Sequence, residues 1–330
     1  MADDSLALPP PQPAPLVALT LADEGARRLR DAFFAGRSPN TQRAYRQSCA
    51  DFASYLSKRL ARPLDEAEAL GELLRAGAGA SNLLALEFRD ALKARPLSPG
   101  SVNRHLSFLR SAVELAKTLG MVPWSLKVPN LKTAGPYKDT RGPGRSAVRY
   151  MLDDLRKRPG PKAVRDRALL RLLYDLGLRR SEAAGLDLEH LDLTGARLAV
   201  LRKGKAERTW LSAPAPTLHA LEAWLALRGA EAGPLFTGFR GGRGKRLAGG
   251  GVYRAVRKMG RNIGEKVRPH GVRHTAITEA VKRATAAGIG LDEVRQFSGH
   301  ADVKTLMIYR DKERDVQGKL AAIVAASAGE

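Results

Sequence analysis

The sequence contains a single cysteine, Cys49, among 330 residues. One thiol cannot form an intrachain disulfide, and it cannot supply a zinc site built from several cysteines. The chain also lacks an apolar run of the roughly 20 residues that a membrane-spanning helix needs. We therefore expect no membrane partner, and the low cysteine content fits a cytoplasmic location.

Several signatures of other functions are missing as well. Aromatic residues make up only 5% of the chain, so the stacking surface typical of RNA-binding modules is not evident. The glycine-rich segment 238–251 lacks the spacing of a phosphate-binding P-loop. No His-Glu-x-x-His motif is present, and no pair of carboxylates is spaced to hold magnesium. The sequence therefore predicts no cofactor and no metal.

What the chain has in excess is positive charge. Its formal net charge is +22, from 56 Lys and Arg against 34 Asp and Glu. Because each cation that neutralises a phosphate releases a counterion, a polyanionic partner is favoured. Double-stranded DNA is the partner we expect. RNA, an anionic membrane and a basic surface that serves only solubility are alternatives that charge alone leaves open.

The residue pattern divides the chain into four parts. Residues 1–21 are proline-rich and are expected to form a disordered tail. Residues 22–131 carry apolar positions at helical spacing, which predicts an all-helical domain. Residues 132–145 contain glycine, proline and charge without an apolar period, which predicts a linker. Residues 146–330 mix helical and strand patterns and predict a second domain.

The second domain is predicted to contain a small sheet. Residues 197–201 and 209–211 read as two strands joined by a Lys203-Gly204-Lys205 turn. Near the carboxyl end, residues 316–325 predict a short apolar helix. The fold class expected for the whole chain is mostly α with a small β-sheet.

The helical domain has one basic edge that suits the backbone of a duplex. Ser38 and Pro39 open a helix whose apolar face alternates with arginines. A second helix opens at Ser98. The tentative DNA contacts lie on these two helices and on the predicted hairpin; they are Thr41, Arg43, Arg46, Asn103, Arg104, Lys205 and Arg208.

Two clusters in the second domain carry groups suited to phosphate chemistry. Arg179 follows a glycine turn at the end of an apolar helix, and Glu182 lies one helical turn later, where it can hold the guanidinium. Lys203 lies in the hairpin turn, where it could donate a proton to a leaving oxygen. Each cluster taken alone is more typical of solvated surface charge.

Three further groups follow. His270 and Arg273 share one face at a helix N-terminus, which favours a phosphate. A zinc site at His270 and His274 would need a third ligand. His300 follows a glycine, and Tyr309 comes nine residues later. A phenol is a poor nucleophile at neutral pH, but nearby arginines stabilise the phenolate and the pentacoordinate phosphate alike.

In their order and spacing these clusters resemble the tyrosine recombinase family, which includes phage integrases and Xer-type site-specific recombinases. The resemblance covers roughly residues 22–325. It implies an N-terminal core-binding domain with a SAM-like helical fold, and a C-terminal α+β catalytic domain. It assigns catalytic roles to six residues and a supporting role to Glu182; the six are Arg179, Lys203, His270, Arg273, His300 and Tyr309. Lys205 is the alternative to Lys203, since the pattern leaves the register of the hairpin open by a residue or two.

The resemblance also implies a mechanism. Tyr309 forms a 3′-phosphotyrosine, Lys203 protonates the departing 5′-oxygen, and Arg179 and Arg273 clamp the phosphate with help from the two histidines. A partner strand then reverses the step, so neither ATP nor metal is consumed. Four protomers on two duplexes would exchange strands through a Holliday junction, with the apolar helix over 316–325 docking on the same protomer or on its neighbour.

Alternatives remain at this point. The same chemistry serves relaxing enzymes of the topoisomerase IB type, and a non-catalytic DNA-binding protein would keep the charge without the reaction. The separate helical domain and the tail favour a recombinase. The sequence does not indicate the target site, or whether a second recombinase takes part.

Overall fold

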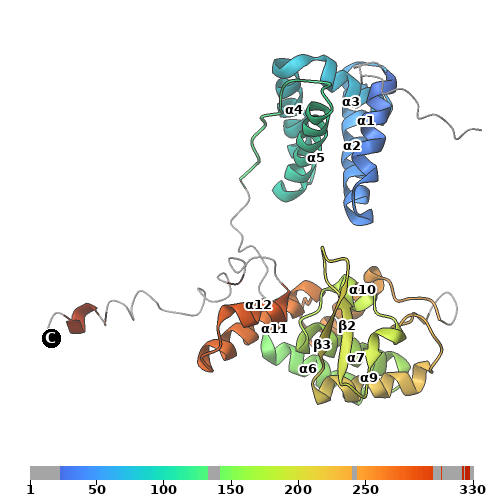
Figure 1. Cartoon of the computed structure of the whole chain (residues 1–330), viewed down its shortest axis with the longest axis vertical. Helices are drawn as coiled ribbons and strands as arrows, with labels where there is room; N and C mark the ends of the chain where they lie inside the picture. Colours follow the sequence, from blue (N-terminus) through green and yellow to red (C-terminus); the bar gives the residue numbers. More distant parts are fainter. Residues whose placement is uncertain are drawn as a thin grey trace, which may run out of the picture. The chain divides into compact units, whose positions relative to one another are not determined.

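The computed structural model describes residues 23–132, 142–239, 244–299, 306, 322 and 324–327. The chain forms two compact units, residues 1–136 and 137–330. The first is built from helices, and the second combines helices with a small sheet (Figure 1). The predicted fold class is therefore confirmed. Within the described ranges, no helix is long and apolar enough to cross a bilayer.

The first unit contains five helices, and their starts follow the polar signals in the sequence. They are α1 (Asp23–Ala35), α2 (Pro39–Arg59), α3 (Glu66–Arg75), α4 (Gly77–Lys93) and α5 (Pro99–Thr118). The side chains of Ser38 and Ser98 accept the backbone N–H three residues on, and each is followed by proline at the first helical position. Asp65 and Glu68 form a complete capping box at the start of α3.

Aromatic side chains fill the core of the first unit. Phe33, Phe52, Phe88 and Phe108 are at most 2% exposed. Phe33 meets Phe108 edge-on with ring centroids 5.5 Å apart, and Phe52 meets Phe88 at 5.2 Å. Such edge-to-face pairs add roughly 0.5–1.5 kcal/mol to the burial of the rings. This core holds α2 and α5, the two helices with the predicted basic edge, in a fixed arrangement.

The second unit is organised around one apolar helix. Its helices are α6 (Gly144–Lys157), α7 (Pro161–Asp175), α8 (Arg180–Ala184), α9 (Ala215–Arg228), α10 (Gly249–Asn262), α11 (Pro269–Ala286) and α12 (Leu291–Ser298). Helix α7 packs against α6, α9 and α11. Trp224 of α9 is buried, and its indole N–H donates to the Leu235 carbonyl at 2.8 Å. Helix α6 begins at Gly144, two residues before the predicted start of the second domain at residue 146.

The sheet has three antiparallel strands in the order β1-β2-β3. They are β1 (Leu191–Asp192), β2 (Arg197–Leu201) and β3 (Arg208–Ser212). Both predicted strands are present, while the two-residue strand β1 was too short to be predicted. Leu198 and Val200 of β2 are fully buried, whereas β3 is mostly exposed. Strand β2 therefore anchors the hairpin in the core.

Several predictions fall on parts of the chain that the structure does not describe. The proline-rich tail 1–21 lies outside the described residues, as do His300 and Tyr309. Of the helix predicted over 316–325, residues 322, 324 and 325 are described, and these are helical.

Candidate active site

Arg179 lies where helix α7 gives way to α8. Gly177 turns the chain with φ +57°, and Arg179 becomes the N-cap residue of α8. The Glu182 carboxylate accepts the Arg179 backbone N–H at 2.8 Å and its Nη1 at 2.7 Å. The Glu182 side chain is 2% exposed and that of Arg179 is 25% exposed. A buried carboxylate thus aims a guanidinium that still reaches solvent.

Arg273 approaches the same turn from helix α11. Because α11 begins at Pro269, His270 and Arg273 both lie in its first turn. Arg273 is 3% exposed. Its Nη1 donates to the carbonyl of Gly177, and its Nη2 donates to that of Ser298 at 2.5 Å. Arg273 is therefore fixed to the same turn from which Arg179 extends.

The carboxyl end of α12 is the point on which both arginines converge. Arg179 Nη2 donates to the Gly299 carbonyl at 3.1 Å, next to the Ser298 carbonyl that Arg273 uses. These carbonyls form the negative end of the helix dipole, which attracts cations. The same guanidinium donors suit the non-bridging oxygens of a phosphate. The structure thus brings together two of the predicted catalytic groups.

His270 stands beside these arginines with an altered proton affinity. Partial burial of the ring lowers its pKa, and the charges of Arg273 and Arg179 lower it further. A histidine with a lowered pKa is neutral at pH 7 and can accept a proton or a hydrogen bond. The lowered pKa also reflects the positive field in which a bound phosphate would lie.

Lys203 projects from the turn between β2 and β3. The Lys205 N–H donates to the Arg202 carbonyl at 3.1 Å, and Gly204 has φ +79°. These features match a type II turn with glycine at its third position. Lys203 is exposed at the second position of the turn. Arg202, the residue before it, is buried and lies 3.9 Å from Glu182.

The remaining two predicted groups come after α12 in the sequence. Gly299 ends α12 in the left-handed conformation, with φ 60° and ψ 36°. His300 and Tyr309 come after it, outside the described residues.

The predicted DNA contacts of the first unit differ in what they already bind. The Asn103 amide donates to the Leu131 carbonyl at 2.9 Å and accepts the Leu131 N–H at 2.8 Å, which gives it a structural role. Arg46 stacks over the Phe34 ring at 4.6 Å. Arg43 and Arg104 are exposed. Arg46 is exposed as well, so Asn103 is the one of these four residues whose side chain is already engaged by the protein backbone.

Of the three other predicted contacts, Thr41 and Arg208 form local hydrogen bonds, and Lys205 is exposed. Thr41 contacts the capping Ser38 hydroxyl at 3.0 Å. In the hairpin, Lys205 is exposed, and Arg208 Nη1 folds back to the Ala199 carbonyl at 3.3 Å.

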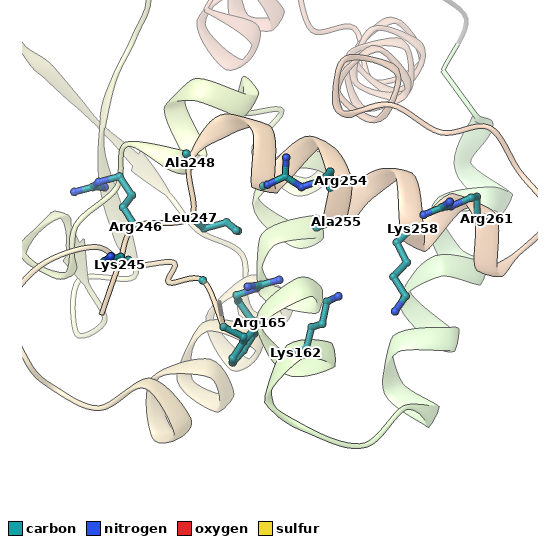
Figure 2. Close-up of a pocket in the computed structure, with 13 residues that line it drawn as sticks. Lys162, Arg165, Lys245, Arg246, Leu247, Ala248, Arg254, Ala255, Lys258 and Arg261 are labelled. Carbon is teal, nitrogen blue, oxygen red and sulfur yellow. The ribbon is translucent and has the colours of Figure 1, made fainter. Parts of the chain in front are cut away.

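A basic groove between α7 and α10 was missed by sequence reasoning (Figure 2). It has a volume of about 780 Å³, and none of the described residues that line it is acidic. Arg254, Lys258 and Arg261 project into it from one face of α10, while Lys162 and Arg165 line it from α7. The three cations of α10 form no ion pair within the described chain.

The groove leads away from the predicted catalytic cluster. A Cβ added to Gly249, the first residue of α10, would lie 3.3 Å from Arg180 Nε, so this end of α10 adjoins the residue after Arg179. The i, i+4, i+7 spacing of the α10 cations was the available sequence signal, because that spacing places side chains on one helical face.

One group of side chains has atoms of the kind that bind metals. Among the described residues, potential ligand atoms of Asp187, Glu189 and His190 lie within 4.8 Å of one another. However, His190 Nδ1 accepts the Asp187 N–H at 2.8 Å, and the Asp187 carboxylate pairs with Arg246. These protein partners give the group a structural role in joining the 187–190 turn to Arg246.

Comparisons with known proteins agree on one family. The model of the phage integrase family matches residues 146–315. A tyrosine recombinase from Synechococcus elongatus is 33% identical over 86% of this chain and 88% of its own length. One from Synechocystis is 31% identical over 88% of this chain and 91% of its own length.

A solved structure shares the fold at lower identity. The XerH site-specific recombinase bound to a palindromic difH substrate has a TM-score of 0.63 and 18% identity, over 92% of this chain and 85% of that one.

Proposed function

The chain belongs to the phage integrase family of tyrosine recombinases, enzymes that cleave and rejoin DNA, and we propose that it does so through a covalent phosphotyrosine at Tyr309. The observation that carries this proposal is the convergence of Arg179 and Arg273 on the carboxyl end of α12, with neutral His270 beside them. Two fixed guanidiniums are the groups that a trigonal-bipyramidal phosphate requires.

The proposed step balances as a transesterification. The Tyr309 hydroxyl attacks the scissile phosphorus, the new bond joins its oxygen to the 3′-phosphate, and the bond from phosphorus to the 5′-oxygen breaks. Neutral His270 accepts the proton that the Tyr309 hydroxyl loses, Lys203 donates a proton to the departing oxygen, and His300 helps to stabilise the charge on the phosphate. Attack by a free 5′-hydroxyl on the phosphotyrosine reverses the step and rejoins the strand.

The cationic side chains neutralise the charge on the phosphate, as magnesium does in many other phosphoryl-transfer enzymes. Arg179 and Arg273 neutralise the two non-bridging oxygens as charge develops on them. We therefore predict that EDTA leaves strand cleavage unchanged. Loss of cleavage on chelation, restored by added magnesium, would contradict this assignment of roles.

The substrate we propose is duplex DNA, gripped by both units. The exposed Arg43 and Arg104 offer phosphate contacts in the first unit, and the groove along α10 offers more in the second. Related recombinases have been solved with DNA bound, which supports this substrate. We further propose that four protomers assemble on two duplexes and exchange strands through a Holliday junction.

A nicked suicide duplex tests the proposal. The duplex is first selected from random sequences by binding to the protein, and the nick lets the short 5′-hydroxyl fragment diffuse away after cleavage. We expect a covalent adduct with the wild type and none with Tyr309→Phe, while both proteins bind the intact duplex equally.

The other outcomes separate the alternatives. Binding without any wild-type adduct would indicate a non-catalytic DNA-binding protein. Adduct formation with relaxation of plasmids, but no recombination between two selected sites, would indicate a topoisomerase-like enzyme.

A further inference from the structure

Arg202 is a buried arginine that the proposed mechanism does not use. It follows β2, directly before Lys203, and is 7% exposed. Burial lowers its pKa, the Glu182 carboxylate raises it, and Arg179 lowers it again. An arginine taken out of water needs strong partners, since desolvation of a cation is costly. The partners of the Arg202 guanidinium therefore indicate its structural role.

Its guanidinium binds the end of helix α12. Nη2 donates to the Phe297 carbonyl at 3.1 Å, and Nη1 approaches the Ser298 carbonyl at 3.4 Å. Nη1 also lies 3.9 Å from the Glu182 carboxylate. The carbonyls at a helix C-terminus are its negative end, so a cation there is stabilised by the dipole as well as by the hydrogen bonds.

The backbone carbonyl of Arg202 stabilises the β2–β3 turn. Its carbonyl accepts the Lys205 N–H at 3.1 Å and so closes the turn on which Lys203 lies. The side chain of Arg202 is fixed to α12, and its carbonyl closes the turn. Arg202 therefore connects the β2–β3 turn to the end of α12. Lys203 itself is exposed, and no described residue forms an ion pair with it. Its position is therefore set by the turn rather than by contacts of its own ammonium group.

The absence of a side chain at Gly299 leaves room for the Arg202 guanidinium. Besides its left-handed backbone, a Cβ on Gly299 would lie 2.7 Å from Arg202 Nη1 and 3.0 Å from its Cζ. The close approach of Arg202 thus occupies the space that a side chain would need. Three arginines, Arg179, Arg202 and Arg273, consequently share the carbonyls of residues 297–299.

We propose that Arg202 is a positioning residue for Lys203: it clamps the β2–β3 turn to the end of α12 and so fixes the proton donor relative to the two catalytic arginines. This inference rests on the proposed function, in which Lys203 protonates the leaving 5′-oxygen. A proton donor held loosely loses rate because the productive geometry is only partly populated, and a displacement of about 1 Å can cost on the order of 100-fold.

A sulfur substitution in the DNA isolates the step that Arg202 serves. In a 5′-bridging phosphorothiolate the bond from phosphorus to sulfur breaks, and the leaving group departs as a thiolate. Because a thiol has a pKa of about 8.5, far below that of an alcohol, this departure needs no proton donor. Single-turnover cleavage is measured on the oxygen and sulfur duplexes with Arg202→Met, Lys203→Ala and the wild type.

We expect Arg202→Met to cleave the oxygen duplex about 10- to 100-fold more slowly than the wild type, and the sulfur duplex within about threefold of the wild-type rate. Lys203→Ala should show a larger loss that sulfur also restores. Arg197→Met is the matched control, because Arg197 is an exposed arginine at the other end of β2. It should cleave both duplexes like the wild type.

Two results would overturn the inference. One is an Arg202→Met protein that cleaves the oxygen duplex at the wild-type rate. The other is a loss for Arg202→Met that sulfur does not restore, while that of Lys203→Ala is restored; the proposed function would then survive without this inference. If sulfur restores neither variant, Lys203 is not the proton donor and both assignments fail, although the Tyr309 adduct is tested separately.

A second variant keeps the test decisive if methionine disrupts the fold, as judged by thermal melting and duplex binding. Arg202→Lys retains a cation that can reach one of the α12 carbonyls. Arg202→Lys should lose less of the cleavage rate on the oxygen duplex than a disrupted protein would. On the sulfur duplex its cleavage rate should equal that of the wild type. A loss that persists on the sulfur duplex would count against the clamp.

Discussion

Glu182→Gln tests how the first catalytic arginine is held. The Glu182 carboxylate accepts two hydrogen bonds from Arg179, at 2.7 and 2.8 Å, and lies 3.9 Å from Arg202. Glutamine has nearly the same shape but no charge, and its amide group offers a donor where a second acceptor is needed. The change therefore leaves two guanidiniums around a neutral side chain.

The size of the effect follows from the hydrogen bonds that the charged carboxylate forms. Hydrogen bonds to charged groups contribute roughly 1.5–3 kcal/mol, and glutamine keeps one acceptor, so we expect the free energy of unfolding to fall by about 2 kcal/mol. For a unit of 150–250 residues, 1 kcal/mol shifts the melting temperature by about 2–4 °C. The melting temperature of the second unit should drop by about 4–8 °C. Cleavage should slow by about 10- to 100-fold as Arg179 loses its alignment.

Differential scanning calorimetry and single-turnover cleavage of the selected duplex measure the two effects. Asp153→Asn is the matched control, because Asp153 forms an exposed pair with Arg156 in the same unit. Exposed i, i+3 pairs on a helix contribute about 0.2–0.5 kcal/mol, so the control should melt within about 2 °C of the wild type. A Glu182→Gln protein that melts and cleaves like this control would refute the reasoning.

Three further predictions concern other groups. Because the pKa of His270 is lowered, the cleavage rate should stay level down to pH 6.5 and fall only below it; an acid limb at or above pH 6.5 would contradict this. The unfolded chain takes up that proton at about pH 6.5, so acid should also destabilise the fold between that pH and the lowered pKa. Lys258→Gln with Arg261→Gln should reduce the slope of log binding constant against log salt by up to about 1.8; an unchanged slope would remove the α10 groove from the DNA-binding surface. Finally, Cys49 is fully buried and burial raises the pKa of its thiol, so thiol reagents should label it only when the first unit unfolds; rapid labelling of the native protein would argue against that packing.

Local signals in the sequence were enough to predict most of the elements. Ser38 and Ser98, each followed by proline, mark the starts of α2 and α5, because capping acts within one turn. The pair Arg179 and Glu182 could be predicted for the same reason, since residues three apart share a helical face.

Features built from distant segments could not be predicted in this way. The carbonyls of α12 that receive Arg179 and Arg273 are about 120 and 25 residues away from them in the chain. The basic groove joins Lys162 of α7 to Arg254 of α10. Asn103 looked like a surface group, yet it is satisfied by Leu131. In each case tertiary packing brings the distant segments together. The spacing of the α10 cations indicates that they share one helical face, but not that α7 lies beside that face.

The most direct test of the central claim is to locate the residue that becomes attached to DNA. The wild-type adduct trapped on the nicked duplex is digested with protease and nuclease, and the modified peptide is identified by mass spectrometry. We predict a single modified peptide with the nucleotide remnant on Tyr309. Strand cleavage without any linked peptide, or a remnant on a different side chain, would contradict it.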